Sequence, residues 1–142
     1  MTDRSDRAQP DRTQSDRAQP PGKVRARLLQ VALGLPGAWE DHPWGETVVK
    51  VDKKVFVFLG VDEAGQNGPR FGVKLTASHA EALGVEGITR MGYGLGKAGW
   101  VDVRIARADV PVEVFEDWVE ESYRAVALKR RVAELDRRTQ AG

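Results

Sequence analysis

The sequence contains no cysteine, and its absence excludes several classes of protein. Disulfide-stapled folds, thiolate metal sites and cysteine nucleophiles all need that side chain. The chain also lacks any run near the roughly 18 apolar residues that cross a bilayer. Its N-terminus has no apolar core of the kind found in secretory signals. We therefore expect a cytoplasmic protein that does not enter the membrane.

A charge excess of either sign is missing as well. The 142 residues carry 22 lysines and arginines against 21 aspartates and glutamates, which gives a net charge of +1. A nucleic-acid-binding protein with so small a total must gather its cations on one face. Hydrophobic residues make up 41% of the chain, which is enough to form the core of one domain.

The first 22 residues have almost nothing to bury. They repeat the block Ser-Asp-Arg-Ala-Gln-Pro at positions 5–10 and 15–20 and contain no aromatic or branched aliphatic residue. Ordering such a segment costs conformational entropy that no apolar burial offsets. We expect a disordered tail over residues 1–22, and we favour an inert extension over a recognition element. A folded domain over residues 23–138 and a short C-terminal tail over residues 139–142 are expected to follow.

Hydrophobic periodicity predicts the elements of that domain. Helical spacing runs from Lys23 to a stop at Gly34, and a short helix follows Ser78, which has capping-box spacing to Glu81. Alternation and apolar runs predict strands over residues 47–51, 55–61, 70–75, 88–91 and 101–105. One long helix is predicted to start at Pro111, and "PGAWEDHPWG" is typical of a loop. This order favours an α+β fold with two layers, in which a mainly antiparallel sheet carries helices on one face.

The stretch "GYGLGKAGW", residues 92–100, contains the glycine pattern of dinucleotide-binding proteins at Gly94, Gly96 and Gly99. That pattern needs a helix behind it, because the helix N-terminus meets the pyrophosphate. Here the alternation of "WVDVRIA" predicts a strand instead. A P-loop is excluded too, since no serine or threonine follows Lys97. We expect no cofactor at this stretch or elsewhere.

The same stretch resembles a motif of the MmcQ/YjbR family of small bacterial proteins, which commonly read G-Y-H-L-N-K-x-H-W before a strand. "LPGAWEDHPWG" at residues 35–45 is similar to a second family motif, and Glu121-Ser122-Tyr123 is similar to the family's D-x-S-Y. The three stretches occur in family order across residues 28–128. The family's two histidines and its asparagine are glycines here, so any polar site that those side chains make in relatives is missing.

The resemblance implies a fold similar to the two-layer α+β folds of bacterial frataxin and secretion chaperones. It also implies DNA binding, because members of the family are often described as DNA-binding proteins. The resemblance names no catalytic residue for this chain.

Strand alternation indicates where DNA would bind. If the apolar residues of the strands at 70–75 and 101–105 face the helices, their polar neighbours share the opposite face, and the stretch before residue 100 forms its rim. The predicted nucleic-acid-binding residues are Lys50, Arg70, Lys74, Arg90, Tyr93, Lys97, Trp100 and Arg104. The cations would hold phosphates and the exposed aromatic rings would stack on bases. The alternative is that these charges only solvate an exposed face, with Trp100 packed at its edge.

A second dense cluster combines Trp39, Asp41, His42 and Trp44 with Glu40. It is our alternative ligand site, for a small molecule. A metal site is not expected, because contiguous Glu-Asp-His side chains rarely converge on one ion. The simpler interpretation is that the two tryptophan rings close the core while the polar residues cap the loop.

Catalysis is not expected from this sequence. His79 follows Ser78, but adjacent side chains on a helix diverge and no third group is present to orient them. We therefore expect a non-enzymatic protein whose partner is DNA. A protein-interaction module or a homodimer that uses the same sheet stays open, because unpaired sheet faces and edges commonly associate.

Overall fold

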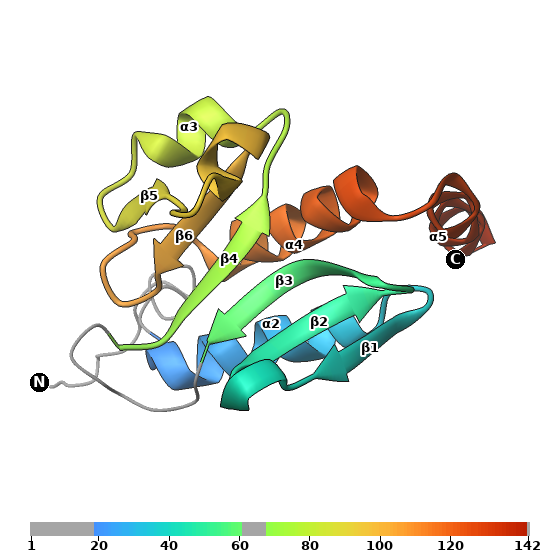
Figure 1. Cartoon of the computed structure of the whole chain (residues 1–142), viewed down its shortest axis with the longest axis horizontal. Helices are drawn as coiled ribbons and strands as arrows, with labels where there is room; N and C mark the ends of the chain where they lie inside the picture. The colour runs from blue at the N-terminus through green and yellow to red at the C-terminus, as the bar shows by residue number, and fades with distance from the viewer. Residues whose placement is uncertain (1–18, 61–67, 142) are drawn as a thin grey trace, which may run out of the picture.

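Figure 1 shows a computed structural model of the protein, which describes residues 19–60 and 68–141. The α-helices of this part are α2 (Pro21–Leu33), α3 (His79–Leu83), α4 (Val112–Val126) and α5 (Lys129–Ala141). The strands are β1 (Ala38–Asp41), β2 (Thr47–Val51), β3 (Lys54–Gly60), β4 (Arg70–Lys74), β5 (Ile88–Arg90) and β6 (Trp100–Arg104). Two 3-10 turns, η1 (Pro43–Gly45) and η2 (Leu95–Ala98), lie between strands. Among the described residues, no helix has both the length and the apolar composition to cross a bilayer.

The ends of the domain differ from the predicted boundaries. Residues 1–18 of the predicted tail lie outside the described residues. Helix α2 begins at Pro21, two residues earlier than expected, because the fixed φ of proline suits the first turn of a helix. At the other end, residues 139–141 were expected to be a tail but continue α5.

All six strands form one antiparallel sheet in the order β1-β2-β3-β4-β6-β5. Strands β4 and β6 pair along their whole length, so that Arg70 lies opposite Arg104 and Lys74 lies opposite Trp100. The short strands β1 and β5 form the two edges. The sheet places segments from both halves of the chain side by side.

Helices α2 and α4 cover one face of the sheet and pass behind it in Figure 1. The side chains predicted to face them do so, since Phe71, Val73, Val101 and Val103 are each at most 1% exposed. Helix α4 contributes Phe115, whose ring centroid lies 5.1 Å from that of Phe71. The predicted class, a two-layer α+β fold with an antiparallel sheet, is therefore confirmed.

The single long helix predicted from Pro111 is in fact two helices. Ala127 has an extended backbone (φ −70°, ψ 154°) that ends α4, and α5 leaves in a new direction (Figure 1). No proline or glycine marks this break. Tertiary contacts hold α5 instead: Leu135 is buried, and Arg131 Nη2 lies 2.9 Å from Asp52 Oδ1 in the turn between β2 and β3.

Two local predictions were also wrong. The predicted loop of residues 36–45 contains β1, which forms because it pairs with β2 along its whole length. The predicted capping box does not form, since the Ser78 side chain caps no amide of α3. Its Oγ donates instead to Glu121 Oε1 of α4 at 2.8 Å. At Ser78 a partner distant in the sequence therefore replaced the local interaction.

Candidate nucleic-acid interface

The open face is the side of the sheet turned away from α2 and α4. Successive side chains of a strand point to opposite faces, so the pairing register assigns residues to this side. Its residues are Trp39, Asp41, Val48, Lys50, Val55, Phe58, Arg70, Gly72, Lys74, Thr89, Trp100, Asp102 and Arg104. Four predicted DNA-binding cations, Lys50, Arg70, Lys74 and Arg104, therefore share one side of the sheet.

Two carboxylates on the open face reduce its positive charge. Lys50 Nζ lies 2.7 Å from Asp41 Oδ2, and Arg70 Nε lies 3.6 Å from Asp102 Oδ1. Burial raises the pKa of Asp102, and the nearby Arg70 and Arg104 oppose that shift. Lys74 and Arg104 make no ion pair within 4 Å with any described residue. These two cations are the ones on the face that remain available to a phosphate.

The centre of the open face is apolar, and this corrects the predicted role of Trp100. That side chain is only 7% exposed, and its ring centroid lies 5.2 Å from that of Phe58 in an edge-on contact. Met91 packs its terminal methyl group over Gly72, 2.1 Å from where a Cβ would lie. Trp100 therefore cannot stack on a base in this conformation, and the interpretation that it packs into the sheet is the correct one.

The rim residues separate into two groups. Tyr93 is fully exposed in a left-handed backbone conformation (φ 59°), and Lys97 is exposed in η2. Arg90, in contrast, lies opposite Val101, whose side chain is in the core, so Arg90 points to the helix side of β5. The structure thus removes Arg90 from the open face and leaves Tyr93 as a fully exposed aromatic ring of the rim.

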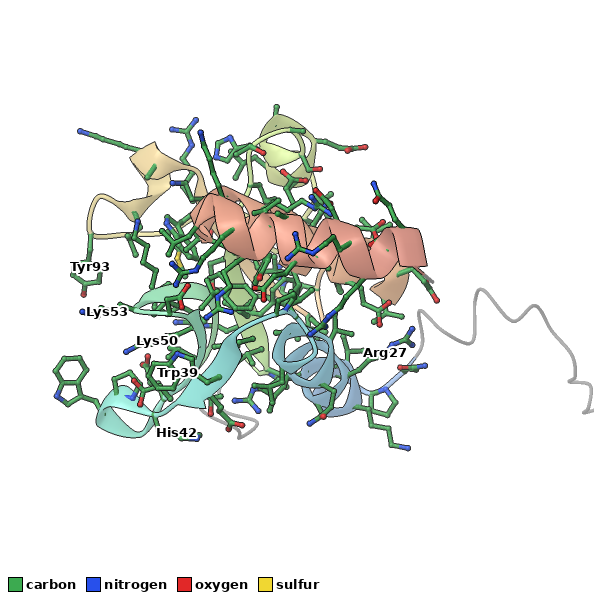
Figure 2. All side chains as sticks on the ribbon, turned by 90° about the vertical axis from the view of Figure 1, so that its right-hand side faces the viewer. Arg27, Trp39, His42, Lys50, Lys53 and Tyr93 are labelled. Carbon is green, nitrogen blue, oxygen red and sulfur yellow. The ribbon has the colours of Figure 1, made fainter. Side chains whose placement is uncertain are left out.

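Trp39 joins the open face from β1, a position that the loop prediction missed. Its Nε1 donates to the Asp52 carbonyl at 2.8 Å, and Lys50 Nζ lies 5.2 Å from the ring centroid. The side chain is 43% exposed, so one surface of the indole remains accessible. Figure 2 shows Trp39, Lys50 and Tyr93 projecting from the same side of the molecule.

In the alternative ligand site the polar side chains pair with neighbouring groups. Asp41 faces Lys50, whereas His42 Nε2 lies 3.0 Å from Glu40 Oε2. The expectation that both tryptophans close the core is wrong, because Trp44 is 98% exposed. No group of three potential metal ligands occurs among the described residues. What remains there is an exposed aromatic pair at the β1 edge of the sheet.

The glycine stretch is followed by a strand, as predicted. It forms the short η2 turn between Gly94 and Gly99, both with positive φ, and leads directly into β6. A Cβ at Gly99 would lie 2.8 Å from the Leu75 carbonyl oxygen. The Gly99 carbonyl also accepts a hydrogen bond from Leu75 N at 3.0 Å. The glycines at these positions allow the stretch to lie close against the end of β4.

A profile of the YjbR family matches residues 33–125, which is most of the chain. The chain belongs to the YjbR family. No curated protein matches it closely enough to add a more specific relationship. All six strands and α4 except its last residue lie within the matched YjbR region, whereas α5 lies outside it.

The stretch Glu121-Ser122-Tyr123, which resembles a YjbR motif, joins three separate segments of this domain. Tyr123 is fully buried, and its hydroxyl donates to the Pro36 carbonyl at 2.6 Å. This bond connects α4 to the second YjbR motif, which begins at residue 35. Glu121 accepts hydrogen bonds from the amides of Thr76 (2.7 Å) and Ser78 (3.0 Å) and so holds the segment between β4 and α3.

Ser122 holds the two central strands of the YjbR sheet where they separate. Its buried Oγ donates to the Phe56 carbonyl of β3 at 2.6 Å and accepts from the Lys74 amide of β4 at 2.8 Å. The pairing of β3 with β4 extends only over Val57 and Phe58. The hydroxyl therefore takes the place of a direct hydrogen bond between the two strands. Through Lys74 it also fixes the backbone of one open-face cation.

Proposed function

We propose that this YjbR protein is a cytoplasmic, non-enzymatic DNA-binding protein that binds through its open face. The observation that supports the proposal best is the register of β4 and β6, which places Arg70, Lys74 and Arg104 on the one face that α2 and α4 leave uncovered. Lys50 extends this set to β2. Cations on a common surface attract phosphates whatever the base sequence.

The proposed contacts fall into two kinds. Lys74 and Arg104, which pair with no described carboxylate, would bind backbone phosphates, with Lys97 at the rim. Trp39 and Tyr93 would stack on unpaired bases, because both rings are accessible and lie on the same side (Figure 2). Asp41 and Asp102 oppose this binding. We therefore expect weak affinity with strong dependence on salt, and a preference for single strands over duplex.

Fluorescence anisotropy of labelled single-stranded and duplex oligonucleotides over a range of salt concentrations tests this proposal. The double variant Lys74→Ala/Arg104→Ala should weaken binding, and for duplex the slope of log K against log salt should fall by about 0.9 for each phosphate that the variant no longer binds. The matched control is Lys23→Ala/Arg137→Ala, which removes the same charge from α2 and α5. Absence of binding at low salt, or equal weakening in both variants, contradicts the proposal.

A second candidate function is self-association through the β1 edge. Strand β1 is an edge of the sheet, and Trp44 beside it is 98% exposed. Exposed edge strands with adjacent apolar side chains are common association sites. Light scattering across a concentration series should then show a homodimer that Trp44→Ser dissociates. A protein that stays monomeric at high concentration argues against this candidate.

A further inference from the structure

A cleft of about 380 Å³ lies between the β2–β3 turn and the link from α4 to α5. Figure 1 shows these two segments side by side at one end of the molecule. This volume is in the range of small-molecule sites, which is roughly 300–1,000 Å³. Leu128 and Arg130, which line the cleft, lie beyond the match to the YjbR family. The cleft is therefore formed partly by residues that the YjbR match does not cover.

The apolar part of the cleft is formed by Val51, Val126 and Leu128. Leu128 is 46% exposed, although it follows a helix that buries most of its large apolar side chains. It lies at the break between α4 and α5, where Ala127 adopts the extended backbone. An aliphatic group placed against these side chains would remove apolar surface from water, which is favourable.

The charged part of the cleft is predominantly positive. Lys53 and Lys54 are exposed and make no ion pair with any described residue. The Arg130 side chain is 69% exposed, and its Nη2 lies 3.9 Å from Asp52 Oδ1. Asp52 also lines the cleft, but its Oδ1 and Oδ2 lie 2.9 Å and 3.3 Å from two nitrogens of Arg131. Arg130 and Arg131 both lie beside that carboxylate, so the lining keeps an excess of positive charge, which Lys53 and Lys54 supply.

We propose that this cleft binds an aliphatic carboxylate. Its hydrocarbon chain would lie against Val126 and Leu128, and its carboxylate would lie among Lys53, Lys54 and Arg130. Neither the carboxylate nor the hydrocarbon chain of the ligand is sufficient alone. Exposed ion pairs contribute little binding free energy in water, and an uncharged aliphatic chain gains nothing from the cations. The combination selects an amphipathic anion. The proposal is independent of DNA binding, since the cleft contains none of the predicted DNA-binding residues.

Isothermal titration calorimetry of the full chain with sodium octanoate tests the proposal, with acetate and octanol as the probes that lack the chain or the charge. We expect saturable binding of octanoate and at least tenfold weaker binding of both other probes. NMR chemical-shift changes in the unmodified protein should concentrate at the β2–β3 turn and at residues 126–130. Absence of octanoate binding, equal binding of octanol, or shift changes elsewhere overturns the proposal.

Substitutions in the cleft give a second, independent test. Lys53→Gln/Lys54→Gln should weaken octanoate binding about tenfold, because two exposed charges are removed. Leu128→Asn should weaken it as well without lowering stability greatly, since this side chain is half exposed. The matched control Lys23→Gln/Arg137→Gln removes the same charge outside the cleft and should leave octanoate binding unchanged. If the control weakens binding as much as the cleft variant, octanoate senses only the net charge and the site is refuted.

Discussion

Removal of one buried hydroxyl, in Ser122→Ala, should destabilise this small domain strongly. The Ser122 side chain is fully buried, and its Oγ contacts both the Phe56 carbonyl at 2.6 Å and the Lys74 amide at 2.8 Å. Neither strand can supply a replacement, because β3 and β4 pair only over Val57 and Phe58. The substitution leaves one buried acceptor and one partly buried donor without a partner.

The size of the effect follows from those two groups. A buried polar group left unsatisfied costs about 1–3 kcal/mol, so the variant should lose about 2–4 kcal/mol of unfolding free energy. That is a large part of the roughly 5–15 kcal/mol that stabilises a typical domain. Urea unfolding followed by tryptophan fluorescence measures the decrease, and an unchanged m-value would show that the unfolding transition is otherwise the same.

Ser78→Ala is the matched control for Ser122→Ala. It removes a hydroxyl that donates to Glu121 at 2.8 Å, but Glu121 keeps its bonds to the amides of Thr76 and Ser78. We expect the control to cost less than about 1 kcal/mol. In Ser122→Ala, but not in the control, hydrogen exchange of the Lys74 amide should accelerate. Equal destabilisation in the two variants, or unchanged exchange at Lys74, would refute the role assigned to Ser122.

Three further predictions concern strain and charge. Gly99→Ala should lower the free energy of unfolding by more than about 2 kcal/mol, because φ is 102° and the new Cβ would lie 2.8 Å from a carbonyl oxygen. Gly94→Ala, with a φ of 81° but open space around the new Cβ, should cost only about 1 kcal/mol. Equal losses in the two variants, measured by urea unfolding, would contradict this. Burial alone would raise the pKa of Glu121, but its hydrogen bonds outweigh burial and lower that pKa. Its stabilisation is therefore present above about pH 4.5 and disappears as the pH falls through the lowered pKa. The difference in thermal unfolding temperature between Glu121→Gln and the unmodified protein should therefore shrink as the pH falls below 4.5. A difference that stays constant with pH would be evidence against this. Burial raises the pKa of Asp102, so its ionised form lowers the stability of the protein at pH 7. Asp102→Asn should therefore be more stable than the unmodified protein at pH 7, and this gain should vanish below about pH 4. A variant that is less stable at pH 7 would contradict the reasoning.

Several features of this fold could be predicted from local patterns alone. The alternation around Val73 and Val103 identified both faces of the sheet, because a side chain on a half-buried strand has only two directions available. The alternation after Gly99 also predicted a strand in place of a helix, and β6 is that strand. These predictions were confirmed because, at these positions, residues close in the sequence determine the conformation.

Other features depended on partners distant in the sequence. Ser78 does not take its predicted helix-capping role because Glu121, 43 positions away, binds its hydroxyl and amide. The break after Val126 has no proline or glycine signal, and contacts such as that between Arg131 and Asp52 determine where α5 lies. Arg25 faces the core side of α2 and donates to the Leu59 carbonyl at 2.9 Å, which no helical periodicity indicates.

The sequence by itself determined the class of the fold and the side of the sheet on which Lys50, Arg70, Lys74 and Arg104 lie, because strand geometry fixes direction residue by residue. Only the tertiary structure decided which of those cations have a carboxylate beside them, and it buried Trp100 while leaving Tyr93 exposed. Ion pairs, burial and clefts depend on distances between segments far apart in the chain. Those distances are set when the sheet and the helices pack, and no local pattern contains them.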